Sequence, residues 1–470
     1  MSIRHIEIKI EPEKPFANCK LGRQKHANVL TDIVNSYSDG FVLAINNKWG
    51  TGKTTFVKMW QQDLKDKKYQ TVYFNAWEND FENNPLTALM GELKILTNES
   101  TEPKFKSTLK RAAILSKHIA PIVTQAIADK YVNTKEIKDA IVNLTKGLTD
   151  IFENDVNEYA KKKKGIAVFR ESLSDFIASI NQSKPLIFII DELDRCRPDY
   201  AVSILEQIKH FFSVPNIVFI LSIDKVQLGN AIRGVYGSDK IDADEYLRRF
   251  IDIEYSIPDP ENGIFYKYLY DYFKFDDILN SAERKKYPEL QTDKENFLRI
   301  CKLLFTNTPI PLRQQEKILV LAKLSLRTFD DNQYVIPSVF LFLNFIKVIY
   351  NDFYEDLKYK RLSINQLQER FFEIIKPNKN EETERELMWL EGYLLNFYNN
   401  FLYTRFNRNK LYEHDKTSGK NKLKIRSIIN EKAENDFLVI FENFDRGRND
   451  GDLDLGYFLK RIDLLENLKL

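Results

Sequence analysis

The chain has 470 residues, enough for two or three domains, and its 70 basic and 68 acidic residues give a formal net charge of +2. The net charge therefore gives no overall electrostatic attraction to nucleic acid or to a membrane. Such binding would have to come from a local patch of charge. Three cysteines without paired spacing (Cys19, Cys196 and Cys301) indicate a reducing compartment, and the histidines show no metal-ligand motif. Residues 1–15 lack the apolar core of a signal peptide, so we expect a cytoplasmic protein.

The first element with a chemical signature is the apolar run Phe41 to Ile45, followed by NKWGTGKTT and an amphipathic stretch. A strand, a glycine-bearing loop and a helix in this order bring backbone N–H groups around a phosphate at a helix N-terminus. The sequence therefore predicts a site for ATP and Mg²⁺. The expected nucleotide ligands are Asn47, Trp49, Gly50, Thr51, Gly52, Lys53, Thr54 and Thr55, with the Lys53 ammonium on the β and γ phosphates and the Thr54 hydroxyl on Mg²⁺.

The loop departs from the pattern GxxxxGK[ST] at one position, because Asn47 stands where glycine is usual. Asparagine tolerates a positive φ better than other non-glycine residues do. We therefore expect Asn47 to adopt a positive φ at a modest cost in strain. The preceding strand and the following helix supply the context that this motif requires.

A second motif, PLIFIIDELDR from Pro185 to Arg195, is an apolar run of strand length that ends in acidic residues. Such a run is typical of a parallel strand covered on both faces, and ligands of open α/β sheets bind beyond the carboxyl ends of the strands. We expect Asp191 to hold Mg²⁺ and Glu192 to act as general base on the attacking water. By itself, DELDR also fits a solvated helix cap.

Three more strand-like runs, Thr71 to Trp77, Asn216 to Lys225 and Ile251 to Pro258, alternate with helical patterns. This alternation predicts an α/β fold with a doubly wound, mostly parallel sheet. Ser222 and Asp224 would face the γ-phosphate if their strand lies beside the strand of the phosphate loop. A guanine nucleotide is less expected than ATP, because SIDK at the end of that run does not match [NT]KxD.

Several segments, in their order, resemble the KAP family of P-loop NTPases, within the additional-strand ATPases related to AAA+ and STAND proteins. They are LGRQKHANVLTDIV (21–34), WGTGKTT (49–55), VYFNAWEND (72–80), the acidic strand with its trailing helix (189–212), FILSIDK (219–225) and YLRRFIDIEYSIP (246–258). A weaker similarity covers PLRQQEKIL (311–319). The resemblance implies an ATP-driven conformational switch and suggests bacterial defence against phage or mobile elements.

The resemblance also implies arginines that act on the nucleotide. Arg313 would reach the γ-phosphate from a helical lid, and Arg248 or Arg249 would act across a subunit interface, which implies a homo-oligomer. Arg195 has an equal claim to that role. For each arginine the alternative is a surface ion pair.

The predicted domain organisation follows from these patterns: 1–100 and 166–258 form the NTPase core, 101–165 a helical insertion, 259–350 an all-α lid, and 351–470 a helical effector or docking module. Members of the KAP family often carry transmembrane hairpins between the phosphate loop and the acidic strand. In this chain the most apolar stretch between those two motifs, Ala112 to Ala128, is interrupted by polar residues and is shorter than the ~20 apolar residues of a membrane span. We expect no membrane span, and we expect the tract Lys161 to Lys164 to be a solvated helix end.

The segment Thr404 to Arg426 is basic and includes Phe406 and Tyr412. It fits either contact with a phosphate backbone or a mobile solvated loop. Two other functions therefore stay open beside the ATPase switch. One is a nucleotide-gated scaffold with little turnover that recruits an effector protein encoded elsewhere, and the other is a nucleic-acid-stimulated motor with its contact at Lys420, Lys422 and Lys424.

Overall fold

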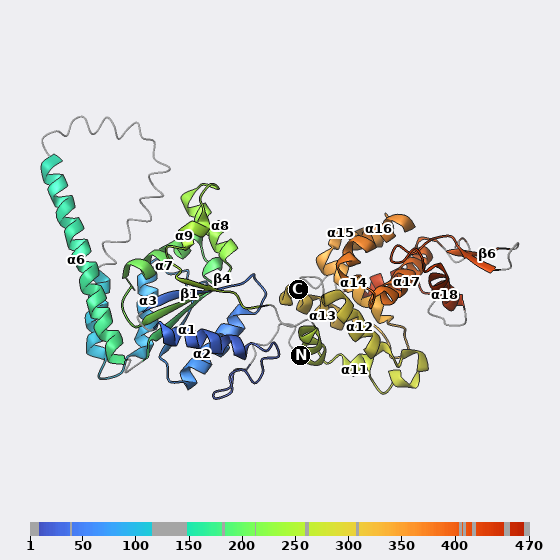
Figure 1. The fold of residues 1–470 in the computed structure, drawn as a ribbon, viewed down its shortest axis with the longest axis horizontal. Coiled ribbons are helices and arrows are strands. Elements are labelled where there is room, and N and C mark those ends of the chain that lie inside the picture. Colours follow the sequence, from blue (N-terminus) through green and yellow to red (C-terminus); the bar gives the residue numbers. More distant parts are fainter. Residues whose placement is uncertain are drawn as a thin grey trace. The chain divides into compact units, whose positions relative to one another are not determined.

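The computed structural model describes residues 9–37, 40–114, 148–180, 184–211, 213–258, 263–306, 310–403, 407, 410–415, 420–445 and 452–464. They fall into two compact units that divide near residue 259. One unit contains a five-stranded sheet with its helices, and the other is mainly helical (Figure 1).

The sheet has the strand order β2-β3-β4-β1-β5, and every neighbouring pair is parallel. The strands are β1 (Phe41–Asn46), β2 (Thr71–Asn75), β3 (Leu186–Asp191), β4 (Ile217–Ile223) and β5 (Ile253–Tyr255). Strand β4 thus separates the strand of the phosphate loop from the acidic strand. In the register, Ser222 lies opposite both Ile45 and Asp191, so β1, β4 and β3 end together at one edge.

Helices cover both faces of this sheet (Figure 1). The helices of the unit are α1 (Gln24–Ser36), α2 (Lys53–Asp66), α3 (Pro85–Leu93), α6 (Leu148–Ile180), α7 (Pro198–Phe211), α8 (Lys225–Tyr236) and α9 (Ala243–Leu247), with a further helix at 102–114 and the short 3₁₀ turns η1 (Lys94–Leu96) and η2 (Leu193–Arg195). Ile187 and Ile189 pack with α1 and α2, whereas Phe188 and Ile190 pack with α3, α6 and α7. Successive strand residues face opposite layers, which explains the unbroken apolar runs and confirms the predicted α/β fold.

The predicted insertion is described only in part. Residues 115–147, with most of the stretch Ala112 to Ala128, lie outside the described residues. Helix α6 continues without a break through Lys161 to Lys164. We had expected this tract to be a helix end, and it lies inside a helix instead. The buried residues Phe169, Phe176 and Ile177 recur at helical spacing beyond it, and their packing favours continuation of the helix. In the part of the chain that the structure describes, no helix combines the length and the apolarity that a bilayer crossing needs.

The second unit contains one continuous hydrophobic core that runs from Tyr266 to Ile462. Its helices are α10 (Ile264–Tyr272), α11 (Asp276–Leu279), α12 (Asp293–Phe305), α13 (Leu312–Leu326), α14 (Pro337–Ile349), α15 (Asn351–Lys358), α16 (Ile364–Ile375), α17 (Glu384–Leu402), α18 (Glu434–Asp445) and α19 (Leu455–Asp463), with 3₁₀ turns η3 (Arg284–Lys286), η4 (Pro288–Leu290) and η5 (Lys376–Asn378). Helix α14 lies in the middle, and all residues from Val339 to Ile346 are buried.

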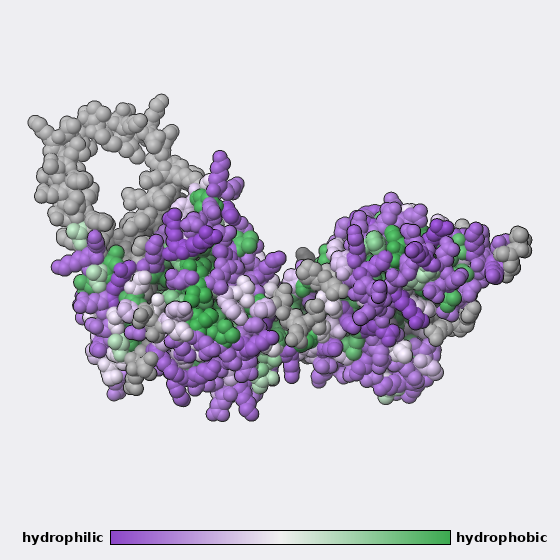
Figure 2. Space-filling view, viewed as in Figure 1, coloured by the Kyte–Doolittle hydropathy of each residue, from purple (hydrophilic) through white to green (hydrophobic). Residues whose placement is uncertain are grey.

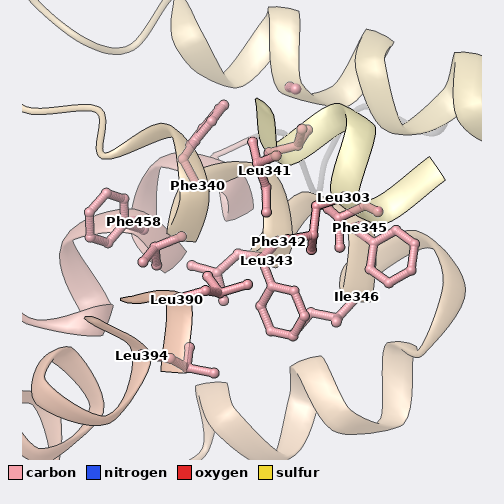
Figure 3. Close-up of a cluster of buried hydrophobic side chains, with 14 of the residues drawn as sticks. Leu303, Phe340, Leu341, Phe342, Leu343, Phe345, Ile346, Leu390, Leu394 and Phe458 are labelled. Atoms are coloured by element: carbon pink, nitrogen blue, oxygen red, sulfur yellow. The ribbon is translucent and has the colours of Figure 1, made fainter. Parts of the chain in front are cut away.

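Figure 3 shows side chains of α14 against Leu303 of α12, Leu390 and Leu394 of α17, and Phe458 of α19. A helix that is apolar all around is a buried helix, and α14 holds its neighbours together. The residues expected to form a lid (259–350) and those expected to form a separate module (351–470) therefore share one core.

A small β-hairpin departs from the expected helical C-terminal region. Strand β6 (Tyr412–Asp415) pairs antiparallel with β7 (Lys420–Leu423) inside the segment expected to be a loop or a nucleic-acid contact. Tyr412 and Leu423 face each other and pack against the core, while Glu413 lies opposite Lys422. Partly buried apolar residues at one end and opposite charges across the pair favour a hairpin that lies on the surface of the core.

The face of each unit that Figure 2 shows is largely hydrophilic. Three large exposed side chains stand out in the sheet-containing unit: Trp49, Trp77 and Phe81 have exposed fractions of 44%, 50% and 78%. All three follow β1 or β2. The loops at the carboxyl edge of the sheet therefore present aromatic side chains to solvent.

Candidate nucleotide-binding site

The loop between β1 and α2 has the backbone that an anion site requires. Gly50 and Gly52 adopt φ values of 79° and 80°, in the left-handed region that favours glycine. Gly52 is the N-cap of α2, no side chain caps this helix, and its first turn has no acidic residue. The first N–H groups of a helix have no partner within the helix, so they are available to a phosphate here.

Asn47 does not adopt the expected positive φ, and that prediction is wrong. Its side chain instead bonds to the backbone of Ile257: Nδ2 donates to the carbonyl oxygen at 2.7 Å, and Oδ1 accepts from the amide at 2.8 Å. The asparagine thus replaces glycine because it ties the loop to the segment after β5. A glycine here would lack both hydrogen bonds.

Lys53 begins α2, and its ammonium donates to the carbonyl oxygens of Asn47 and Lys48. Burial lowers the pKa of Lys53, and the negative charges of Asp194, Asp224 and Asp191 oppose this shift. Lys53 therefore lies in the field of the carboxylates that follow β3 and β4. The structure brings the predicted phosphate-binding lysine and the predicted acidic residues into one site.

Asp191 is almost fully buried at the end of β3, and both of its carboxylate oxygens accept hydrogen bonds. Tyr73 Oη donates to Oδ2 at 2.9 Å, and the Glu192 amide donates to Oδ1 at 3.0 Å. Within the described ranges no cluster of three His, Cys, Asp or Glu side chains could hold a metal alone. One carboxylate and one hydroxyl, from Asp191 and Thr54, fit Mg²⁺, which usually takes its other ligands from water and phosphate.

Glu192 has a left-handed backbone, with a φ of 60°, which is uncommon for a residue with a side chain and is found at functional sites. Its Oε1 lies 2.7 Å from Arg195 Nη1, and its Oε2 accepts from Asn75 Nδ2 at 3.2 Å. Burial raises the pKa of Glu192, and the positive charge of Arg195 lowers it in part. A raised carboxyl pKa suits a general base.

Ser222 and Asp224 differ in their roles at the end of β4. Ser222 is fully buried between β1 and β3, and its Oγ has no hydrogen-bond partner. Asp224 is engaged at both oxygens: Oδ1 caps α8 by accepting from the amides of Val226 and Gln227, and Oδ2 accepts from the Trp49 amide at 3.2 Å. Asp224 thus positions the loop, whereas the Ser222 hydroxyl is enclosed by the protein and has no hydrogen-bond partner.

A known protein family contains the same motifs in the same order. The KAP family P-loop domain matches residues 23–381. The chain belongs to the KAP family of P-loop NTPases. The resemblance predicted from the motifs is confirmed.

Among curated proteins, the KAP chain is similar to the phage T7 exclusion protein of Escherichia coli (strain K12), with 21% identity over 232 residues. That segment is 47% of this chain but only 30% of the relative. Among solved structures, the Aeropyrum pernix ORC2 protein in its ADPNP-ADP complexes has 13% identity and a TM-score of 0.34, covering 90% of this chain and 95% of that one. The Drosophila ORC bound to DNA has 12% identity and a TM-score of 0.29, covering 97% and 88%.

The four candidate arginines of this KAP protein occupy different places. Arg195 lies beside Glu192. Arg248 is exposed and pairs with Glu245 at 3.1 Å. Arg249 lines a cleft of about 360 Å³ with Phe41 and Ile217, at the amino ends of β1 and β4 and thus opposite the phosphate loop. Arg313 belongs to the first turn of α13 in the other unit, and its role stays a prediction.

Sequence reasoning missed several residues that support the site. Arg23, the N-cap residue of α1, is buried and donates to the carbonyl oxygens of Gly52 at 3.0 Å and of Thr51 at 2.5 Å, so it braces the phosphate loop. Asn75 contacts Glu192, and Trp77 lies against Arg195. These residues stand in the segments LGRQKH and FNAW, which carried the family resemblance but suggested no chemistry.

Proposed function

We propose that this KAP protein binds Mg-ATP and hydrolyses it as a conformational switch. The observation that supports this most is the common edge at which β1, β4 and β3 end in register. There Lys53 lies in the field of Asp191, Asp194 and Asp224, beside an uncapped helix N-terminus. A cation, free backbone donors and a metal-binding carboxylate are the groups that a bound triphosphate requires.

The residues divide into three roles. The Lys53 ammonium and the amides at the start of α2 would hold the phosphates, while the Thr54 hydroxyl and the Asp191 carboxylate would hold Mg²⁺. Bound Mg²⁺ supplies positive charge against the charge that develops during phosphoryl transfer. The Glu192 carboxylate would accept the proton of the attacking water.

One observation favours the slow-turnover scaffold as a second candidate. Both Glu192 oxygens are engaged, by Arg195 and Asn75, and a base held in this way activates water poorly. The nucleic-acid-stimulated motor has less support, because Lys420 and Lys422 lie opposite Asp415 and Glu413 in the hairpin. Paired charges leave less positive field for a phosphate backbone.

The biological setting is also proposed. The similarity to a phage T7 exclusion protein supports a part in defence against phage, in which nucleotide binding would change the state of an oligomer or recruit an effector. Arg248, which is exposed, and Arg249, which lines the cleft at the opposite edge of the sheet from the phosphate loop, suit contact with a neighbouring subunit. A lid role for residues 259–350, with Arg313 on the γ-phosphate, belongs to the same proposal, as does a cytoplasmic location.

Binding and turnover can be measured separately. The wild type should bind ATP more tightly than GTP, and Lys53→Ala should abolish binding of both. Glu192→Gln should keep ATP binding but lower steady-state phosphate release by about 100-fold or more. Glu102→Gln, at an exposed ion pair with Lys106, is the matched control and should behave as wild type. Equal rates in wild type and Glu192→Gln would remove Glu192 as the base, and failure to bind ATP would refute the proposed function.

A further inference from the structure

Arg195 is tied to three parts of the candidate site at once. Its guanidinium pairs with Glu192 at 2.7 Å, and its Cζ lies 5.9 Å from the ring centroid of Trp49 and 5.7 Å from that of Trp77. Trp49 belongs to the phosphate loop, and Trp77 follows β2. A guanidinium stacks well on an indole ring, so the two tryptophans fix the position of a charge that would otherwise be mobile.

The pairing with Arg195 holds Glu192 in a form that is unsuited to catalysis. Arg195 takes one carboxylate oxygen and Asn75 takes the other. The left-handed φ of Glu192 shows that the chain accepts local strain to place the side chain here. A water molecule must reach one of these oxygens before its proton can be accepted.

The same guanidinium is linked to the phosphate-binding residues. The indole of Trp49 donates to Asp194, and its backbone amide donates to Asp224. The charge of Arg195 also acts on Lys53, adding to the effect of burial. A change at the phosphate loop therefore reaches Arg195 both through its stacking partner and through the electric field.

We propose that Arg195 is a positioning residue that holds the Glu192 carboxylate out of use until the phosphates of a bound nucleotide attract the guanidinium. This inference rests on the proposed ATPase function. A triphosphate beside Lys53 offers several anionic oxygens, and a guanidinium binds phosphate and carboxylate through the same planar geometry. Exchange of one partner for the other would couple nucleotide binding to the release of the base.

The test compares Arg195→Gln with wild type in steady-state phosphate release at saturating Mg-ATP. While nucleotide is bound the guanidinium is shared between Glu192 and the phosphates, so loss of the remaining hold should raise kcat about threefold, the factor that a partly exposed ion pair supports. Loss of the contact with phosphate should raise KM at the same time. Arg197→Gln is the matched control, because Arg197 contacts Asp80 and Asn83 outside the site, and it should leave both constants unchanged. Arg195→Lys, which keeps the charge but not the planar fork, should fall between wild type and Arg195→Gln.

The separate effects on kcat and KM distinguish this role from a merely structural one. A purely structural loss would lower the amount of active protein and so lower kcat. If Arg195→Gln folds poorly, Trp77→Leu removes one stacking face of Arg195 instead and should raise kcat in the same way.

The outcomes are distinct. A higher kcat together with a raised KM supports the hold. A kcat and a KM equal to those of Arg197→Gln would overturn it, and so would a lower kcat at unchanged KM, because Arg195 would then act on the transition state. Failure of the ATPase proposal looks different: Glu192→Gln would then release phosphate as fast as wild type, whatever Arg195→Gln does.

Discussion

The side chain of Asn47 and the backbone of Ile257 form two reciprocal hydrogen bonds, of 2.7 and 2.8 Å. They join the first residue of the phosphate loop to the chain that leaves β5, the edge strand beside β1. The departure from the usual glycine is therefore a structural tie between two neighbouring segments. The two bonds hold the start of the loop on the β5 side of β1, the side away from β4.

This tie predicts a loss of stability on substitution. Asn47→Ala should lower the free energy of unfolding by about 1–2 kcal/mol, because two hydrogen bonds are lost and the Ile257 backbone groups are left without these partners. Asn47→Gly, which restores the common motif, should lose at least as much. Chemical denaturation of both variants measures this. A glycine variant as stable as wild type would show that the two bonds contribute nothing.

Gly52 tolerates no side chain. Its φ of 80° is strained for other residues, and a Cβ would lie 3.0 Å from Arg23 Nη1. Gly52→Ala should displace the Arg23 guanidinium from the carbonyl oxygens of Thr51 and Gly52 and weaken ATP binding by about tenfold or more. Gly91→Ala, at a helical position with open space around it, is the control for ATP affinity. Unchanged affinity in Gly52→Ala would contradict the proposed brace.

The activity should depend on pH from both sides. Burial raises the pKa of Glu192 above 4.5, and the base must be ionised, so kcat should begin to fall at a higher pH than for an ordinary glutamate as the solution is acidified. Burial lowers the pKa of Lys53 below 10.5, so ATP affinity should fall earlier than for an ordinary lysine as pH rises. Lys53→Arg keeps its charge and should lose the alkaline limb of the affinity profile. A limb that persists there would assign it to another group.

A buried ion pair stabilises the helical unit. Arg284 and Asp293 are both buried and bonded to each other, and Arg284 Nη1 also donates to the Gln333 carbonyl at 3.0 Å. Asp293→Asn leaves a buried guanidinium without its counter-charge and should cost roughly 3–5 kcal/mol. Asp352→Asn, at the exposed pair with Arg370, should cost less than about 1 kcal/mol. Similar losses in the two variants, measured by thermal and chemical denaturation, would show that burial does not matter here.

Helices α17 and α18 approach closely at Gly392. A Cβ at this position would lie 2.6 Å from Ile440 Cγ2. Gly392→Ala should therefore destabilise the protein by roughly 1–3 kcal/mol through overpacking. In an Ile440→Ala background the clash is absent, and the same substitution should cost much less. Additive effects in the double-mutant cycle would argue against direct contact.

Several features of the sheet around the candidate site were predicted correctly from the sequence because they depend on local chemistry. The run before Asn47 and the run before Asp191 had to be buried strands, and parallel strands place their carboxyl ends at one edge. The hairpin at 412–423 was not predicted, because its strands are short and their apolar residues face a core that the local pattern does not reveal.

The sequence by itself determined the family and the α/β fold and located the phosphate-loop motif and the acidic strand, since periodicity and motif spacing are properties of neighbouring residues. Only the tertiary structure decided that β4 separates β1 from β3 and that Asn47 bonds to Ile257. It also decided that Arg195 forms an ion pair with Glu192 and contacts two tryptophan rings. These relationships join residues from separate segments. Strand order and side-chain packing bring these residues together, and no pattern of neighbouring residues in the sequence shows which distant segments will meet.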